Sequence, residues 1–203
     1  GVVFLPGKEI TGIHDHGHTG AEVSTADGDI LRARHIVVAA GSWSGKLLKK
    51  RGYRLPMQDG KGYSMTLERP SLKPSIPSIL HEARVAITPM GDDLRISGTL
   101  EISGMDDQIN PHKVNSILKA VPEYYPGMKI RDAGAVWFGY RPCTPDGMPY
   151  IGPLQSGSAV IMATGHAMMG LSLAPVTGRI VKDMLAGISS GHALNKTEPS
   201  RFR

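Results

Sequence analysis

The sequence contains little cysteine and no long apolar stretch. Its single cysteine, Cys143, excludes an internal disulfide framework and indicates a reducing compartment such as the cytoplasm. No apolar run reaches the roughly 18 residues expected of a membrane-spanning helix. With 203 residues, the chain is long enough to bury a substantial core. These properties predict a soluble globular protein with one large or two small domains.

Several catalytic signatures are also missing. The sequence has no recognisable Ser/His/Asp arrangement, paired carboxylates, Cys-x-x-Cys or G-x-x-x-x-G-K-[ST] phosphate loop. Cys143 lies between Pro142 and Thr144 without an adjacent His or Lys to activate it, which favours a packing role over nucleophilic catalysis. The chemistry therefore does not look hydrolytic, and we expect a cofactor to carry any reaction.

The charged residues contain two local clusters. The net charge is +5, but the basic residues concentrate only at residues 46–54, where a solvated helix face is favoured over an acidic or nucleic-acid partner. Residues 14–18 read His-Asp-His-Gly-His, and this pattern at a polar turn is more typical of a solvated loop than of a metal site. We therefore predict neither a nucleic-acid partner nor a metal.

The first 54 residues read as short strands joined by tight turns. The chain has no initiator methionine or signal peptide and enters an apolar run at once, as expected of a piece of a larger protein. Strands are expected at residues 2–5, 9–14, 21–25 and 36–40, with a hairpin turn at residues 27–28. The last of these strands should be buried on both faces. Gly41 then allows close approach to a ligand, and Ser42 or Ser44 is expected to cap a helix at residues 46–50.

The middle of the chain predicts a hairpin followed by a helix. Glycines around Lys61 indicate a bend or bulge that exposes Tyr63 or its neighbours. Apolar residues alternate with polar ones from residue 85 to residue 102, as in a sheet covered on one side. A helix is expected to begin at residues 110–111 and to stop at Pro122.

The segment from residue 137 to residue 187 carries the strongest functional signals. Arg141 follows an apolar strand and precedes Pro142, so a stiff backbone presents its guanidinium, which matches a carboxylate bidentately. A structural salt bridge from Arg141 to Asp146 or Asp132 is the alternative. Residues 164–170 join a buried strand to a helix expected at residues 171–185, with Pro175 in its first turn or at a kink. A helix N-terminus here would stabilise an anion or a reduced flavin, although a tight structural connection is equally compatible with the pattern.

Five segments, taken in order, resemble the C-terminal half of the FAD-dependent D-amino-acid oxidase superfamily. The nearest branch is that of the bacterial D-amino-acid dehydrogenases, with the glycine and sarcosine oxidases as relatives. The segments are His-Ile-Val-Val-Ala-Ala-Gly-Ser-Trp-Ser at residues 35–44, Gly-Lys-Gly-Tyr-Ser at residues 60–64, and residues 94–101, 137–152 and 164–170.

The resemblance implies a mixed α+β and α/β fold. It combines part of a glutathione-reductase-type FAD-binding domain with a substrate domain that has a mixed, largely antiparallel sheet and flanking helices. Residues 1–54 and 141–203 would belong to the FAD-binding domain, and residues 55–140 to the substrate domain. The family's N-terminal G-x-G-x-x-G is absent from this sequence.

The resemblance also implies roles for individual residues. Arg141 would grip the substrate carboxylate, with Tyr63 and Met168 as further substrate contacts. Met168 stands where glycine oxidases have an additional arginine, which favours an apolar substrate side chain. The implied cofactor contacts are Gly41, Trp43, Gly165, His166, Met168, Met169 and Gly170.

The implied reaction is the oxidative deamination of a D-amino acid. A hydride would pass from the substrate Cα to flavin N5, and the imino acid would hydrolyse to a 2-oxo acid and ammonia. Glycine, sarcosine, other N-methyl amino acids and D-hydroxyproline are alternative substrates, and an anion-binding module is the alternative that is not an enzyme. The implied partners are an electron acceptor (quinone, carrier or oxygen) and a missing N-terminal half, without which this piece would be inactive and would not retain FAD. A cytoplasmic location, with peripheral association at the inner face of the cell membrane, would accompany this function.

Overall fold

Two units make up the computed structural model, which describes residues 1–130, 133–188 and 194–202. The first unit combines Gly1–Gln58 with Arg141–Arg203, and the second unit is Asp59–Tyr140. Each unit has its own hydrophobic core, with a single large cluster in the second unit and two clusters in the first. The mixed α/β class predicted from the sequence is confirmed.

The first unit contains an antiparallel sheet of three strands near its beginning. These strands are β1 (Ile10–Asp15), β2 (Ala21–Thr25) and β3 (Ile30–Ala33), in that order. The predicted hairpin is confirmed, because β2 pairs with β3 and Gly28 adopts φ +92° in the turn between them. The strand expected at residues 2–5 is wrong. These residues are exposed coil, since no strand in the described part of the chain pairs with them.

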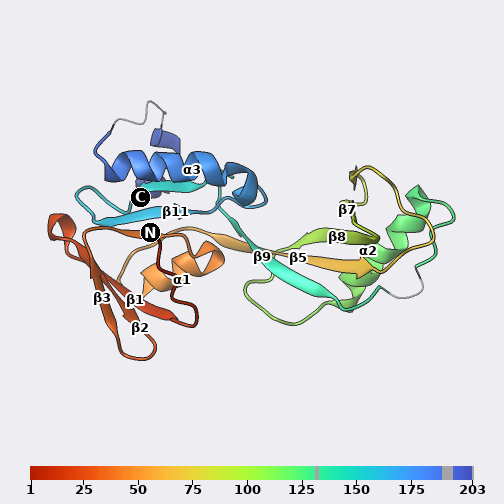
Figure 1. Ribbon diagram of the computed structural model, residues 1–203, viewed down its shortest axis with the longest axis horizontal. Coiled ribbons are helices and arrows are strands. Elements are labelled where there is room, and N and C mark those ends of the chain that lie inside the picture. Colours follow the sequence, from red (N-terminus) through yellow and green to blue (C-terminus); the bar gives the residue numbers. More distant parts are fainter. Residues whose placement is uncertain (131–132, 189–193, 203) are drawn as a thin grey trace. The chain divides into compact units, whose positions relative to one another are not determined.

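A second sheet of the same unit has the order β10-β11-β4. It consists of β10 (Tyr150–Pro153), β11 (Val160–Thr164) and β4 (Ile36–Val38), and β11 runs parallel to β4. Helix α3 (Gly170–Leu185) lies along this sheet and packs Ile180 and Val181 against Ile151 and Ile161 (Figure 1). The prediction that residues 36–40 are buried on both faces is wrong at Val37, which is 40% exposed because β4 is an edge strand.

Two helix details of this unit differ from the prediction. Helix α1 (Ser44–Lys49) begins earlier than expected, and neither predicted serine caps it, because its N-cap is Trp43 and the Ser44 hydroxyl bonds elsewhere. Helix α3 begins at Gly170, so Pro175 lies inside it beyond the first turn. The backbone of Pro175 has no N–H to donate to the preceding turn. The C-terminal segment adds two short 3₁₀ turns, η3 (Leu194–Lys196) and η4 (Pro199–Phe202).

The second unit is a sheet of five strands covered by a helix. The strands follow the order β6 (Ser78–Leu80), β7 (Val85–Met90), β8 (Asp93–Glu101), β5 (Gln58–Leu67) and β9 (Trp137–Cys143). The first residue of β5 and the last three residues of β9 belong to the first unit. The predicted alternation is confirmed where Ile87, Leu94 and Ile96 are fully buried and Arg95 is exposed. The pattern breaks at Leu100 and Ile102, which are exposed.

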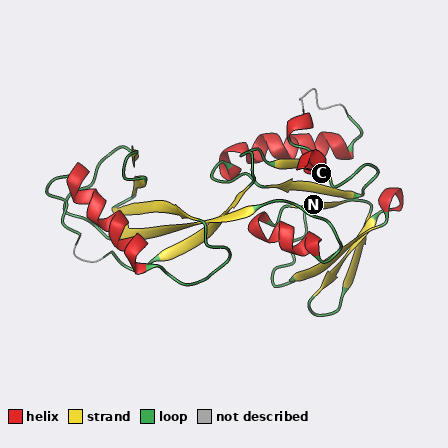
Figure 2. Cartoon of the chain, turned by 180° about the vertical axis from the view of Figure 1, so that it is seen from behind, coloured by secondary structure: helices red, strands yellow, loops and turns green. Residues whose placement is uncertain are grey.

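Helix α2 (Pro111–Tyr124) contacts β7 and β8 and covers this core (Figure 2). The predicted cap is confirmed, since the Asn110 side chain accepts hydrogen bonds from the backbone of His112 at 3.1 Å and of Lys113 at 3.4 Å. The predicted stop at Pro122 is wrong. The helix continues to Tyr124 because the amide of Tyr125 still donates to the carbonyl of Val121 at 2.9 Å.

Candidate functional site

The candidate site lies where β4 and β11 end. The two strands are parallel neighbours, with Ile36 opposite Val160 and Val38 opposite Met162. Their carboxyl ends therefore meet at one edge of the sheet, which is where open α/β sheets bind ligands. A 3₁₀ turn, η2 (Gly41–Trp43), follows β4, and residues 165–169 lead from β11 into α3.

One buried hydroxyl connects the two strand ends. Thr164 accepts a hydrogen bond from the Ser44 hydroxyl at 3.1 Å and donates one to the carbonyl of Gly41 at 3.2 Å. Both hydroxyl-bearing residues are buried. Gly41 has φ +52°, and no described atom lies within 4 Å of the place where its Cβ would be, so a ligand has room to approach this backbone.

The backbone of the loop from Gly165 to Met169 is constrained by two positive φ angles and a hydrogen bond. Gly165 has φ +81°, and a Cβ here would lie 2.7 Å from Cγ2 of Thr144. Ala167 also has positive φ, at 48°, and its amide donates to the carbonyl of Pro142 at 3.1 Å. The loop is thus held against the end of β9, directly beyond Arg141.

Arg141 is half-buried on β9, and this burial lowers the pKa of its guanidinium. Of the two carboxylates that the sequence offers as salt-bridge partners, Asp146 forms a bidentate pair with Arg201, through Nε at 2.8 Å and Nη2 at 3.0 Å. The other, Asp132, lies outside the described residues. A guanidinium supported by a strand and a proline can bind a carboxylate with defined geometry.

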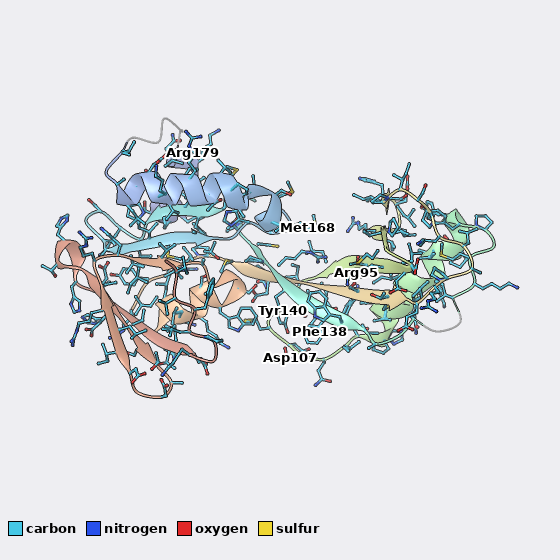
Figure 3. All side chains as sticks on the ribbon, in the orientation of Figure 1. Arg95, Asp107, Phe138, Tyr140, Met168 and Arg179 are labelled. Carbon is cyan, nitrogen blue, oxygen red and sulfur yellow. The ribbon has the colours of Figure 1, made fainter. Side chains whose placement is uncertain are left out.

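The start of α3 presents apolar side chains and backbone donors. Met168 is 75% exposed and Leu171 is 91% exposed, and Figure 3 shows Met168 at this end of the helix. The N-cap residue, Met169, makes no capping hydrogen bond with its side chain, and the first turn in the described chain contains no acidic residue. The first N–H groups and the helix dipole therefore favour a negatively charged group near this end.

His166 faces the helix rather than solvent. Its Nε2 atom lies 3.0 Å from the hydroxyl of Thr177, a buried residue about two turns into α3. Burial lowers the pKa of His166, so the imidazole is neutral at neutral pH. The contact with Thr177 ties the loop before α3 to the helix.

The structure corrects the predicted exposure of Tyr63. Its side chain is 1% exposed, and its hydroxyl donates to Glu101 at 2.8 Å and accepts from the amide of Asn110 at 3.2 Å. The bend or bulge predicted around Lys61 is confirmed as a shift in register between Lys61 and Tyr63 within β5, and only the exposure is wrong. Tyr63 is therefore placed as a buried structural residue in the second unit.

Sequence reasoning missed two groups. The first is the Ser44–Thr164 link, whose members are 120 positions apart and whose types are common. The second is the ammonium of Lys61, which is surrounded by aromatic rings. The histidines at positions 14, 16 and 18 join no group of three potential metal ligands within the described ranges.

The sequence profile of a family described as FAD dependent oxidoreductase matches residues 1–184. The chain belongs to this family of oxidoreductases. A D-amino acid dehydrogenase from Methylobacterium radiotolerans is 34% identical over 189 residues, covering 92% of this chain and 45% of the relative. One from Rhizorhabdus wittichii is 35% identical over 191 residues, again covering 92% of this chain and 45% of the relative. The chain thus spans about half the length of the curated relatives it matches.

Two solved structures share this architecture. A glycine oxidase from Geobacillus kaustophilus superposes with a TM-score of 0.85 at 25% identity, covering 96% of this chain and 52% of that one. An L-proline dehydrogenase from P. horikoshii superposes with a TM-score of 0.75 at 19% identity, covering 94% of this chain and 54% of that one. The second likeness concerns the fold alone.

Proposed function

We propose that this chain is the substrate-facing and flavin-facing part of an FAD-dependent oxidoreductase that deaminates D-amino acids. The observation that carries the proposal is the hydrogen bond from Ala167 to Pro142, which joins the strand bearing Arg141 to the uncapped start of α3. The backbone hydrogen bond thereby connects Arg141, which can anchor a carboxylate, to the N-terminus of α3, which favours a negative charge. The name of the M. radiotolerans relative supports D-amino acids as the substrate class.

The residues at the sheet edge fit a flavin. Gly41 leaves space beside its backbone, and Gly165 has a backbone conformation and surroundings that exclude a side chain. Trp43 and Met169 offer exposed apolar surface. The buried hydroxyl of Ser42 has no hydrogen-bond partner within the described residues, so it can bond to a polar group of a ligand. We assign FAD contacts to these residues and to His166, Met168 and Gly170. When bound, FAD supplies the acceptor for the hydride that leaves the substrate Cα.

Arg141 orients the substrate in this proposal. Its guanidinium fixes the carboxylate bidentately, which limits rotation of the substrate and presents the Cα–H bond in one direction. The N-terminus of α3 stabilises the negative charge that develops during the reaction. The imino acid then hydrolyses to a 2-oxo acid and ammonia in water.

Met168 favours substrates with apolar side chains, because the residue is exposed and apolar at the start of α3. This preference ranks larger D-amino acids above glycine and sarcosine. The second candidate, oxidation of an N-methyl amino acid or D-hydroxyproline, uses the same carboxylate anchor. A substrate panel on the full-length protein with an artificial electron acceptor, with and without oxygen, separates these substrates and distinguishes a dehydrogenase from an oxidase. If the protein oxidises none of these amino acids, the proposal is overturned.

We further propose that the chain does not hold FAD without the rest of its protein, an N-terminal half in our assignment. One edge of β4 has no neighbouring strand in the described part of the chain, and Val37 on this strand is partly exposed. An edge strand presents backbone N–H and C=O groups with which a further strand can pair. Residues 1–203 expressed alone should be colourless, and flavin absorbance that survives gel filtration would contradict this assignment. Tight binding of a carboxylate ligand without FAD would instead favour an anion-binding module.

Peripheral association with a membrane is a further proposal for the first unit. Exposed Trp43 precedes a basic segment that contains Lys46, Lys49, Lys50, Arg51 and Arg54. Such a combination can bind an anionic lipid surface. Across the residues searched, no helix has the length and apolar character needed to cross a bilayer. Co-sedimentation of the full-length protein with vesicles that contain phosphatidylserine tests the proposal, with neutral vesicles as the control.

A further inference from the structure

The second unit contains an almost wholly buried lysine. Lys61 on β5 is 1% exposed, and its ammonium donates to the carbonyl of Gln108 at 2.6 Å. Burying a charged group is costly unless nearby groups compensate for the lost water. The groups that surround this ammonium therefore show which elements the side chain connects.

Three aromatic rings surround the Lys61 ammonium. Its Nζ atom lies 5.3 Å from the ring centre of Phe138, 5.9 Å from that of Tyr63 and 6.0 Å from that of Tyr140. These distances are within the range of attraction between a cation and an aromatic face. Phe138 and Tyr140 lie on β9, the strand beside β5, and Figure 3 labels both together with Asp107.

Two tyrosine hydroxyls bind the same connecting segment that Lys61 binds. We name residues 102–110, which join β8 to α2, the β8–α2 segment. The hydroxyl of Tyr140 donates to Asp107 at 2.9 Å, and the hydroxyl of Tyr63 accepts from the amide of Asn110 at 3.2 Å. With the bond from Lys61 to Gln108, side chains of β5 and β9 hold this segment at three successive places.

Lys61 lies at the centre of this arrangement because its ammonium faces the rings of β9 and also donates to the Gln108 carbonyl of the β8–α2 segment. Tyr140 and Arg141 are consecutive residues of β9, so contacts that hold the backbone at Tyr140 also restrain the backbone that carries Arg141. An apolar residue of equal length would fill the same space, but it would give up the attraction to the rings and the bond to Gln108. The charge of Lys61 therefore serves to link β9 to the β8–α2 segment, and an uncharged side chain of the same volume would not make this link.

We propose that Lys61 is a positioning residue: its ammonium, held between the rings of β5 and β9 and the Gln108 carbonyl, fixes β9 at Phe138 and Tyr140 and thereby restrains the backbone that carries Arg141. The inference rests on the proposed role of Arg141 in substrate binding. Lys61 does not touch the substrate in this assignment. Its effect reaches the substrate through the strand.

The test compares Lys61→Met with wild type in the full-length protein, and uses Lys113→Met, which changes an exposed lysine of α2, as the matched control. Hydrogen–deuterium exchange should become at least about tenfold faster in the β8–α2 segment and in β9, and should stay unchanged in Lys113→Met. The KM for the best D-amino acid should rise about 5- to 50-fold while kcat changes less than about threefold. Lys61→Arg, which keeps the charge, should recover most of both effects.

Phe138→Leu provides a second variant in case Lys61→Met does not fold, because it removes the nearest ring and keeps an apolar side chain. It should raise exchange in the same segment and raise KM in the same direction. Unchanged exchange in either folded variant, or faster exchange with an unchanged KM, overturns the proposal. If the wild type oxidises no D-amino acid, the proposed function fails, and faster exchange in β9 still supports Lys61 as the group that fixes this strand.

Discussion

The hydroxyl of Ser44 donates to the hydroxyl of Thr164 at 3.1 Å, although the two residues are 120 positions apart in the chain. The hydroxyl of Thr164 in turn donates a hydrogen bond to the carbonyl of Gly41 at 3.2 Å. The end of β11 is therefore fixed by side-chain hydrogen bonds to the turn and helix that follow β4. This link determines where the backbone of the candidate site lies.

Thr164→Val should lower the free energy of unfolding of the first unit by about 1–3 kcal/mol. The substitution preserves shape but leaves the buried Ser44 hydroxyl without its acceptor, while the Gly41 carbonyl keeps only the hydrogen bond from the amide of Ser44. Urea denaturation measures the change. Thr88→Val at a half-exposed position of β7 is the matched control and should change stability by less than about 0.5 kcal/mol. Equal effects of the two substitutions would show that the link contributes nothing.

Arg141→Met in the full-length protein should raise the KM for D-amino acids by about 10- to 150-fold, which corresponds to the loss of a charge-assisted pair of about 1.5–3 kcal/mol. Arg141→Lys should recover only part of the affinity because an ammonium cannot reproduce the bidentate geometry. The control is Arg179→Met on the exposed side of α3, which Figure 3 labels. Wild-type kinetics in Arg141→Met would rule out the assignment.

Gly165→Ala should destabilise the loop more than Gly187→Ala does. Both glycines have positive φ, at 81° and 66°, but only at Gly165 does the added Cβ meet a described neighbour, at 2.7 Å from Thr144. Both variants carry the conformational strain, so their difference isolates the steric contact. We expect the difference in unfolding free energy to be about 1–3 kcal/mol, measured by denaturation. A larger effect at Gly187 would contradict the packing described here.

The ion pair between Asp146 and Arg201 should make stability depend on pH. The hydrogen bonds from Arg201 lower the pKa of Asp146 from 3.8 to about 2. A carboxylate with a lowered folded-state pKa stabilises the fold above its unfolded pKa, and this stabilisation is lost as the pH falls from about 4 towards 2. Because the carboxylate is partly exposed, solvent screening limits the contribution to less than about 1 kcal/mol.

Urea denaturation of wild type and Asp146→Asn at several pH values measures that contribution. The stability difference between the two proteins should be constant from pH 7 to pH 5 and should shrink below pH 4. The control is Asp92→Asn, in the exposed turn between β7 and β8, which should show no comparable change. A difference that grows on acidification would refute the assigned sign.

Local patterns in the sequence predicted much of the fold. The alternation of side chains from residue 85 onward predicted the β7–β8 hairpin, because one covered face imposes a period of two residues. Asn110 followed by Pro111 predicted the start of α2, because the cap and the proline both act within one turn. These features depend on neighbours in the sequence, so the sequence is sufficient to find them.

Features that depend on distant partners were not predictable in this way. The glycines beside Lys61 correctly indicated an irregularity in the strand, but the expected exposure of Tyr63 was wrong, because β5 has neighbouring strands on both sides and is buried by its position in the sheet. The exposure of Val37 likewise reflects the place of β4 at an edge. Local patterns pointed to Arg141 and to residues 164–170, and the resemblance implied their roles, while their connection through Pro142 and Ala167 required the three-dimensional structure.

The second unit interrupts the first between Gln58 and Arg141, and the chain leaves and returns on β5 and β9, which are adjacent in one sheet. Exit and return at neighbouring strands allow everything between them to lengthen, shorten or be exchanged without opening the core of the first unit. Proteins of this architecture can therefore diversify the inserted part while the surrounding part stays constant. In evolutionary terms, this pair of strands is a place where the fold tolerates insertion and exchange of a segment.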